Sequence, residues 1–241
     1  MRRRYLCGAL VGVLAIAAAL SATAGRATPS MRHGPIHKIT NSTSTNWSGY
    51  AVTGSRFTTV SSSWTQPTAT CSTTAYSSFW VGLDGDTSNT VEQTGTDADC
   101  SGKTPVYYAW YEMYPKYPVN YTNTVRPGDK MSASVTTSGS GNFALTISDT
   151  TQGWSRTTTA RLKSAKLSSA EVIAEAPSSS GGVLPLANFG TVNFTGASAN
   201  GSLLTSSTPH IDEIVMANGS TVKAQPSGIS SGVFSDTWKH S

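Results

Sequence analysis

The pattern of apolar and polar residues along the chain is that of many short β-strands. Runs rich in β-branched and aromatic residues recur from about residue 46 onward, separated by clusters of Gly, Ser, Asp, Asn and Pro. No window of helical length keeps a 3.6-residue period. Short strands with turn signals between them predict an all-β fold, an antiparallel β-sandwich. The predicted strands span residues 56–65, 77–83, 90–93, 106–114, 130–136, 143–148, 157–162, 170–176, 191–195, 211–216 and 221–224.

Alternation within these strands assigns side chains to faces, because every second residue of a strand points the same way. Glu171, Ile173 and Glu175 share one face of their strand, while Val172, Ala174 and Ala176 share the other, which is the expected core face. Trp110 lies on the same face as Glu112, and Gln93 lies on one face of the strand before them. Two interpretations stay open: a solvated sheet face, or a concave ligand surface with carboxylates over an aromatic floor.

The N-terminal segment has the composition of a secretory signal. Three arginines at positions 2–4 precede an apolar stretch over residues 6–20, and an A-x-A site ends at residue 24. The apolar stretch is short for a membrane anchor, which is the alternative. We therefore expect a signal peptide over 1–24, a basic leader or propeptide over 25–40, and one domain over 41–241.

The net charge of +4 reflects mainly these N-terminal segments. Six of the 17 basic residues precede residue 40, leaving 11 basic against 13 acidic residues in the domain. A domain with this balance and no basic stripe is not expected to bind nucleic acid. After signal removal, no remaining stretch is apolar enough to predict a membrane association.

The cysteines predict one disulfide. Cys7 lies inside the predicted signal peptide, so Cys71 and Cys100 are the two cysteines of the domain. In a chain exported to an oxidising compartment, a Cys71–Cys100 disulfide is favoured over two free thiols.

Histidines and metal ligands offer little catalytic chemistry. His33 and His37 lie in the leader, so we discount them as site residues, and His210 and His240 are far apart with no metal-ligand spacing. We expect no metal and no cofactor. Carboxylates and side-chain amides are then the groups left to carry out any catalysis.

Seven short segments occur in order along the domain: TNWSGY (45–50), FWVGLDG (79–85), EQTG (92–95), AWYEMYP (109–115), PGD (127–129), AEVIAE (170–175) and ANFG (187–190). Their order and spacing resemble the glutamic peptidases, also called eqolisins. The resemblance implies a concanavalin-like sandwich of two curved antiparallel sheets and a secreted endopeptidase that acts at acidic pH.

The resemblance also implies the site. The catalytic Gln and Glu of the family fall on Gln93 and Glu175. The residues similar to those around the family cleft are Trp80, Asp84, Trp110 and Glu112. One departure is Tyr108, which stands where fungal members often carry Asp before Ala-Trp, and it changes the expected local hydrogen bonding.

This pair is chemically sufficient for peptide hydrolysis. Glu175 can take a proton from water and return it to the leaving amine, and the Gln93 amide can stabilise the oxyanion without adding a charge. We expect a secreted monomer acting on protein or peptide substrates. The alternatives are a carbohydrate-binding, lectin-like sandwich, and a glycoside hydrolase using Glu112 and Glu175.

Overall fold

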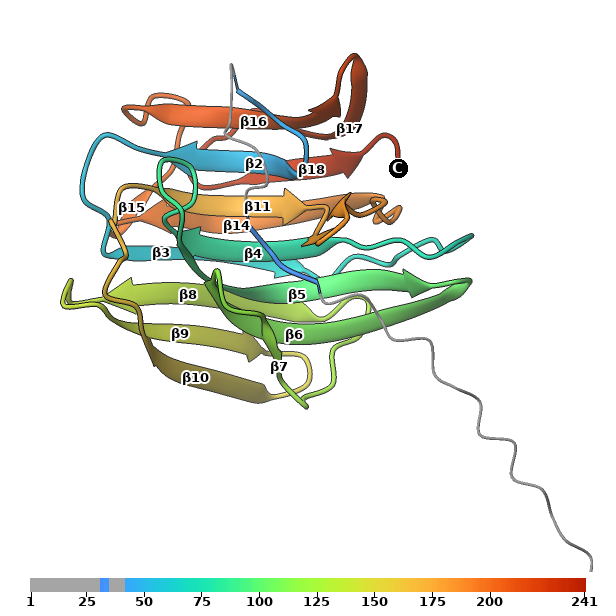
Figure 1. Ribbon diagram of the computed structural model, residues 1–241, viewed down its shortest axis with the longest axis horizontal. Coiled ribbons are helices and arrows are strands. Elements are labelled where there is room, and N and C mark those ends of the chain that lie inside the picture. Colours follow the sequence, from blue (N-terminus) through green and yellow to red (C-terminus); the bar gives the residue numbers. More distant parts are fainter. Residues whose placement is uncertain (1–30, 35–41) are drawn as a thin grey trace, which may run out of the picture.

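The computed structural model describes residues 31–34 and 42–241, and every regular element in those ranges is a β-strand (Figure 1). The predicted all-β class is confirmed. Within the described ranges, no helix has the length and apolar character needed to cross a membrane. The predicted signal peptide lies outside the described residues, and of the predicted leader only residues 31–34 lie inside them.

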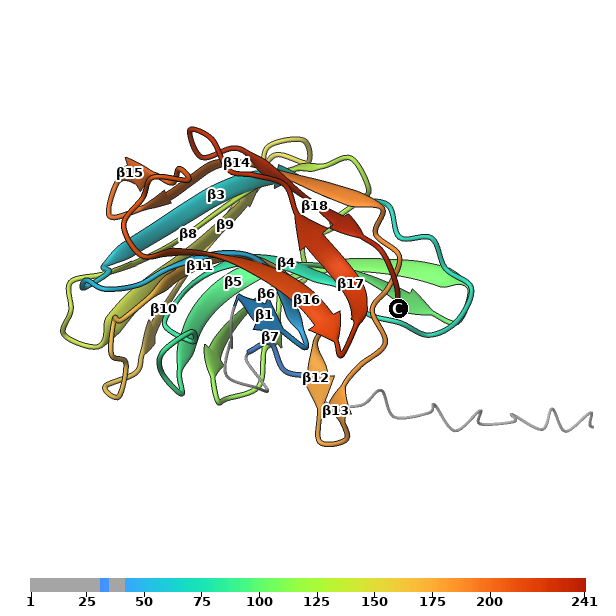
Figure 2. The same ribbon diagram turned by 90° about the horizontal axis from the view of Figure 1, so that it is seen from above.

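Most of the described strands belong to one antiparallel path that folds over into two stacked layers (Figure 2). One layer runs, in spatial order, through β10 (Trp154–Arg161), β9 (Asn142–Asp149), β8 (Lys130–Thr137), β3 (Thr59–Thr65), β14 (Thr191–Ala199) and β18 (Phe234–Trp238). β17 (Thr221–Pro226) continues this path to the second layer, and β15 (Ser202–Leu203) pairs with β14.

The second layer carries the segments that resemble a catalytic site. Its spatial order is β16 (Ile211–Asn218), β2 (Trp47–Val52), β11 (Ala170–Glu175), β4 (Ser78–Leu83), β5 (Val91–Ser101), β6 (Thr104–Tyr114) and β7 (Val119–Asn120). β1 (Thr43–Ser44) pairs with β16 in parallel, and β12 (Ser178–Ser179) forms a small hairpin with β13 (Gly182–Val183).

Alternation along β11 divides its side chains between two apolar clusters. Val172 and Ala174 join the main core between the layers, where they belong to the same cluster as Ile147 of β9 and Phe194 of β14. Ile173 points to the opposite face and belongs to a second cluster rich in tryptophan. Both faces of β11 are therefore buried, and the face assignment predicted from alternation is confirmed for this strand.

The observed strands differ from the predicted ones where polar residues are buried. β5 is 11 residues long, from Val91 to Ser101, whereas the prediction covered only residues 90–93. Its Thr, Asp and Gly residues lower the β-propensity, yet all but the last residue are buried because strands flank β5 on both sides. Tertiary context overrides propensity here.

The predicted disulfide is confirmed. Cys71 and Cys100 are bonded, with their Cα atoms 5.4 Å apart. Cys100 lies near the end of β5, and Ala75, between Cys71 and β4, pairs with it as an isolated bridge. The bond therefore ties the chain that enters β4 to the far end of β5.

Candidate active site

The register of four adjacent strands brings the predicted site residues together. Gln93 on β5 lies directly opposite Glu112 on β6. Glu175, the last residue of β11, lies opposite Ser78 on β4, and Trp80 lies two residues further along β4 on the same face. Directly opposed residues hold their Cβ atoms about 4.5–5.5 Å apart, so these side chains share one surface.

Three fully buried tryptophans form the floor of this surface: Trp47, Trp80 and Trp110. Trp47 and Trp80 pack edge to face with ring centroids 5.0 Å apart. Gly95 lies between Trp80 and Trp110 in the sheet register. A Cβ at Gly95 would lie 2.5 Å from the Trp80 Cβ, so only glycine fits at this position.

The Glu175 carboxylate is held by three donors. Oε2 accepts a hydrogen bond from Trp80 Nε1 at 2.7 Å, while Oε1 accepts from Asn46 Nδ2 at 3.1 Å and from the Gly34 backbone N–H at 2.9 Å. Burial raises the pKa of Glu175 to about 8, and the positive charge of His33 and the hydrogen bonds from Gly34 and Trp80 keep it from rising further. A covered Glu175 therefore keeps its proton in acidic solution.

The Gln93 amide is fixed from two sides. Its Nε2 donates to the His33 carbonyl oxygen at 2.5 Å and to Glu112 Oε2 at 3.2 Å. Gln93 is fully buried. The amide nitrogen thus faces a backbone carbonyl, as an oxyanion donor would.

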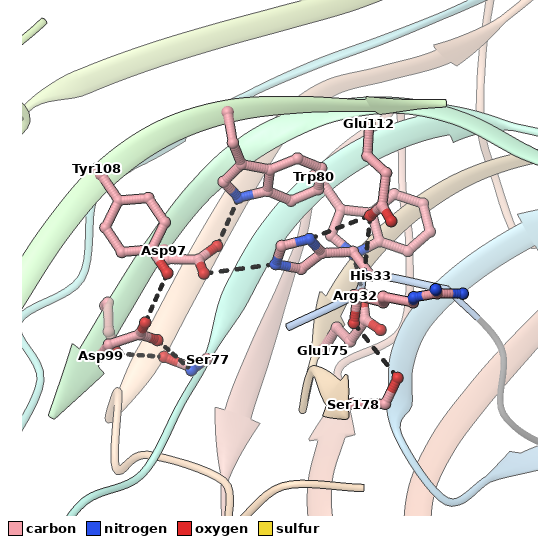
Figure 3. A network of polar contacts seen from close by, with 12 residues as sticks. Arg32, His33, Ser77, Trp80, Asp97, Asp99, Tyr108, Glu112, Glu175 and Ser178 are labelled. Carbon is pink, nitrogen blue, oxygen red and sulfur yellow. Dashed lines mark hydrogen bonds and ion pairs between the residues drawn. The ribbon is translucent and has the colours of Figure 1, made fainter. Parts of the chain in front are cut away.

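The leader segment brings a histidine into this site, so discounting His33 as a site residue was wrong. Its ring lies between two carboxylates, with Nδ1 3.2 Å from Glu112 Oε2 and Nε2 3.4 Å from Asp97 Oδ2 (Figure 3). The backbone pairing of Arg32 with Ser178 explains the error, because it places the following residue, His33, over the tryptophan floor. His37 lies outside the described residues.

The environment of His33 favours its charged form. The ring stacks on Trp110, with centroids 3.8 Å apart and planes 6° from parallel. Burial by itself would lower the pKa of His33, but Asp97 and Glu112 together outweigh it and raise the pKa well above its usual range. Burial raises the pKa of Glu112, and the His33 imidazolium opposes that rise.

A row of polar residues on β5 extends the site beyond the predicted set. Asp97 accepts from Trp110 Nε1 at 2.5 Å, and Asp99 accepts from the Tyr108 hydroxyl at 2.7 Å. Tyr108, the noted departure, therefore donates a hydrogen bond to Asp99. Asp97 and Asp99 were missed, but their alternation with Gln93 could have revealed them once β5 was extended to its full length.

The hydrogen-bond partners of the Asp84 carboxylate lie in the loop before β11 rather than at the Glu175–Gln93 pair. Asp84 sits in a left-handed backbone conformation with φ of 68°. Its carboxylate accepts from the backbone N–H groups of Lys166, Leu167 and Ser168, each at 2.8 Å. Asp84 therefore anchors the loop that leads into β11. Across the described part of the chain, no group of three or more His, Cys, Asp or Glu side chains could hold a metal ion.

Comparisons with known proteins agree with this geometry. The sequence profile of the Peptidase A4 family matches residues 45–233. Scytalidopepsin B of Scytalidium lignicola is 37% identical over 110 residues, which are 45% of this chain and 41% of that protein. Aspergillopepsin-2 of Aspergillus niger is 29% identical over 181 residues, 65% of this chain and 64% of that protein. The matches thus span less than two thirds of either relative.

The fold is also similar to that of a solved structure. The crystal structure of scytalido-glutamic peptidase with a transition state analog inhibitor superposes with a TM-score of 0.71 at 28% sequence identity. The match covers 81% of this chain and 98% of that chain. The predicted two-layer β architecture is supported by this likeness.

Proposed function

The chain belongs to the Peptidase A4 family, and on that premise we propose that it is a glutamic endopeptidase with Glu175 and Gln93 as its catalytic pair. One observation carries the assignment of the pair. Both side chains contact the same backbone peptide, Gln93 at the carbonyl oxygen of His33 and Glu175 at the N–H of Gly34. A hydrolase must polarise the carbonyl group and protonate the nitrogen of the peptide bond that it cleaves, and these are the two groups contacted here.

The mechanism follows from these contacts. Ionised Glu175 takes a proton from a water molecule as the water oxygen attacks the carbonyl carbon. The Gln93 N–H stabilises the negative charge that develops on the carbonyl oxygen. Glu175 then gives its proton to the amide nitrogen, the C–N bond breaks, and a carboxyl and an amino group are released.

An acidic working range suits this carboxyl. Burial is the main cause of the raised pKa of Glu175, so the pKa falls when the site opens to water. A carboxyl that is ionised in the open site and protonated when covered can act first as a base and then as an acid. This cycle needs a pH near the pKa that Glu175 has in the open site, which is lower than its pKa in the covered site. We therefore infer an acid-acting enzyme.

Family membership favours peptide over carbohydrate chemistry. A lectin-like sandwich has no need of an amide held against a peptide carbonyl, whereas Gln93 makes that contact. A glycoside hydrolase would use Glu112 with Glu175, but Glu112 is engaged by Gln93 and His33. We infer that protein or peptide chains are the substrates.

The setting of the enzyme rests on two further inferences. The predicted signal peptide favours secretion, so we infer that the protein acts outside the cell. The site groups described above all come from one chain, so a monomer supplies what the reaction needs. Size-exclusion chromatography of the exported protein tests directly whether it is a monomer.

The test of the pair is digestion of an acid-denatured protein by purified exported enzyme across acidic and neutral pH. Glu175→Gln should lower the rate by about 10⁴-fold or more, because an amide neither accepts nor returns the proton. Glu171→Gln is the matched control, since Glu171 lies on the same face of β11 and is held neutral by burial, which raises its pKa well above the usual range. A folded Glu175→Gln variant that still digests protein would remove Glu175 from the mechanism.

A further inference from the structure

A hollow at the edge of the molecule, which we call the Lys223 pocket, has a lysine in its wall. Its volume is about 630 Å³, and its walls come from the ends of β16 and β17, the segment after β13, the chain between β1 and β2, and the residues after β18. Two basic side chains line it, Lys223 and His240, and no Asp or Glu side chain is among the lining residues. The pocket is therefore opposite in charge to the carboxylate-rich candidate active site.

The Lys223 ammonium is a buried charge with no protein partner in the described part of the chain. Lys223, on β17, is only 8% exposed, and its ammonium makes no hydrogen bond or ion pair with any described residue. Burial lowers the pKa of Lys223, because the charged form loses hydration. Buried charges in proteins are normally paired, so Lys223 is suited to bind an anionic group that enters the pocket.

The backbone around Lys223 brings a second basic group to the pocket. The Lys223 carbonyl oxygen accepts from the N–H of Lys239 at 2.7 Å and from that of His240 at 3.0 Å. These bonds fix the residues after β18 against β17, and the imidazole of His240 lines the pocket as a result. Imidazole is the side chain that gains a positive charge as a solution becomes acidic, so the pocket favours anions most in the range proposed for the enzyme.

Two segments of the candidate active site continue into the wall of this pocket. Asn46 donates to Glu175 Oε1 at 3.1 Å, and Thr45 beside it lines the pocket. Val183 also lines the pocket, and it lies opposite Ser178 in the β12–β13 hairpin. Figure 2 shows this hairpin and the ends of β16 and β17 on the same side of the molecule. The pocket is thus an extension of the candidate site rather than a separate surface.

The contacts of Gly34 indicate which side of a cleaved bond the pocket serves. Glu175 contacts the Gly34 N–H, which is the position of the leaving amine in the proposed mechanism. The Gly34 carbonyl accepts from Asn46 Nδ2 at 2.9 Å. A substrate chain that continues from this carbonyl leaves Glu175 on the side of Asn46, where Thr45 begins the pocket wall. The Lys223 pocket therefore lies on the leaving-group side.

We propose that the Lys223 pocket is a substrate subsite that binds a carboxylate on the leaving-group side of the cleaved bond, with Lys223 as its main partner and His240 as the second. This inference rests on the proposed peptidase function and names the class of substrate that the enzyme prefers. The carboxylate belongs either to an Asp or Glu side chain or to the C-terminus of a short peptide. A contact this far from the reacting atoms holds the substrate equally in the ground and transition states, so it acts on KM rather than on kcat.

The first experiment compares pairs of synthetic peptides at pH ~5, where a free Glu side chain is mostly ionised. All peptides share one bond that the wild type is first shown to cleave in a denatured protein, and all end in an amide. The residues after that bond are neutral except at one position, which is Glu in one member of a pair and Gln in the other. We expect KM to be about tenfold lower for the Glu peptide at one or more positions, with kcat unchanged. Equal KM values at every position exclude a side-chain carboxylate.

A second set of peptides tests the other source of the carboxylate. The neutral peptide is shortened one residue at a time, and each length is compared as a free acid and as an amide. A lower KM for the free acid at one length, with no Glu preference in the first set, identifies the C-terminal carboxylate as the ligand. Equal KM values in both sets overturn the proposal.

Variants assign the preference to the lysine. Lys223→Met keeps the aliphatic stem and removes the charge, so it should lose the preference while cleaving the neutral peptide as the wild type does, which also shows that it is folded. Lys223→Arg should retain most of the preference, because a guanidinium also binds carboxylates. Lys239→Met is the matched control: Lys239 is exposed, contacts the same Lys223 carbonyl and does not line the pocket. A preference that survives in Lys223→Met, or that is lost equally in Lys239→Met, overturns the role of Lys223.

The neutral peptide separates this inference from the proposed function. A wild type that cleaves the neutral peptide and shows no carboxylate preference overturns the subsite and leaves the peptidase function standing. A wild type that cleaves neither the denatured protein nor any peptide overturns the proposed function and the subsite together.

Discussion

At the scale of single residues, the position of Gln93 explains how a neutral side chain can contribute to hydrolysis. Its amide is held between Glu112 and a backbone carbonyl, so it needs no rearrangement when charge develops on that oxygen. A charged donor in its place would instead perturb the pKa of Glu175 nearby.

Removing this donor should reduce turnover without unfolding the protein. Gln93→Ala is expected to lower kcat by about 10²–10³-fold, as measured by steady-state cleavage of a peptide at acidic pH. Gln152→Ala is the matched control, because Gln152 bonds to Asp129 in a turn of the opposite layer. Circular dichroism and melting must first match the wild type. An unchanged kcat in Gln93→Ala would exclude the oxyanion role.

At the scale of elements, β5 and β6 carry most of the polar site groups, and the Cys71–Cys100 bond fixes the far end of β5. Residues Gln93, Asp97 and Asp99 sit on one face of this strand, so any slip in its register would turn all of them away from the site. The disulfide constrains the loop that leads into β4, the strand on the other side of β5.

Loss of the disulfide should therefore lower stability more than it changes the chemistry. The bonded residues are 29 apart in sequence, for which chain entropy predicts a loss of about 3–4 kcal/mol. Cys71→Ser combined with Cys100→Ser should lower Tm by roughly 10 °C in calorimetry. Activity of the still-folded variant, assayed well below its Tm, is the control. An unaltered Tm would show that the bond does not constrain the unfolded chain.

At the scale of the whole molecule, several carboxyl groups outside the catalytic pair are buried. Burial raises the pKa of Glu92 to about 9, with help from the negative charge of Asp84, and raises that of Asp236 to about 8. Free carboxyl groups in an unfolded chain titrate near pH ~4. The folded protein thus holds protons that the unfolded chain releases between these values.

Stability is therefore expected to be highest in acid. For a group whose pKa is raised on folding, the stabilisation is complete below the unfolded pKa and is lost as pH rises towards the folded pKa. Each such group lowers the free energy of unfolding by about 1.4 kcal/mol per pH unit in that window. Urea unfolding should give a free energy several kcal/mol smaller at pH ~7 than at pH ~4.5.

A matched variant isolates one of these groups. Asp236→Asn replaces a protonated carboxyl with a neutral amide of the same shape, so its stability should depend less steeply on pH than that of the wild type. A free energy of unfolding that is flat or rises over this range would mean that the buried carboxyls are ionised in the folded protein.

Local pattern was enough to predict the all-β class, many of the longer strands, the faces of β11 and the disulfide. Strand alternation, turn residues and the two domain cysteines are properties of short stretches, and burial rewards the same alternation in the folded state. The motif order also singled out Gln93 and Glu175, an assignment that stays a prediction. Trp80, Trp110 and Glu112 were expected near them and lie there.

Only the tertiary structure decided what else enters the site. His33 meets Glu112 across 79 residues, and Gly34 meets Glu175 across 141, separations that no local pattern encodes. The predicted strand ended at residue 93 and omitted the polar half of β5, because the burial of that half depends on its neighbours β4 and β6. Asp84 was expected at the cleft, yet its position after β4 directs it to the loop before β11. Sequence fixes which chemical groups are present, but the pairing of distant strands determines which of them meet.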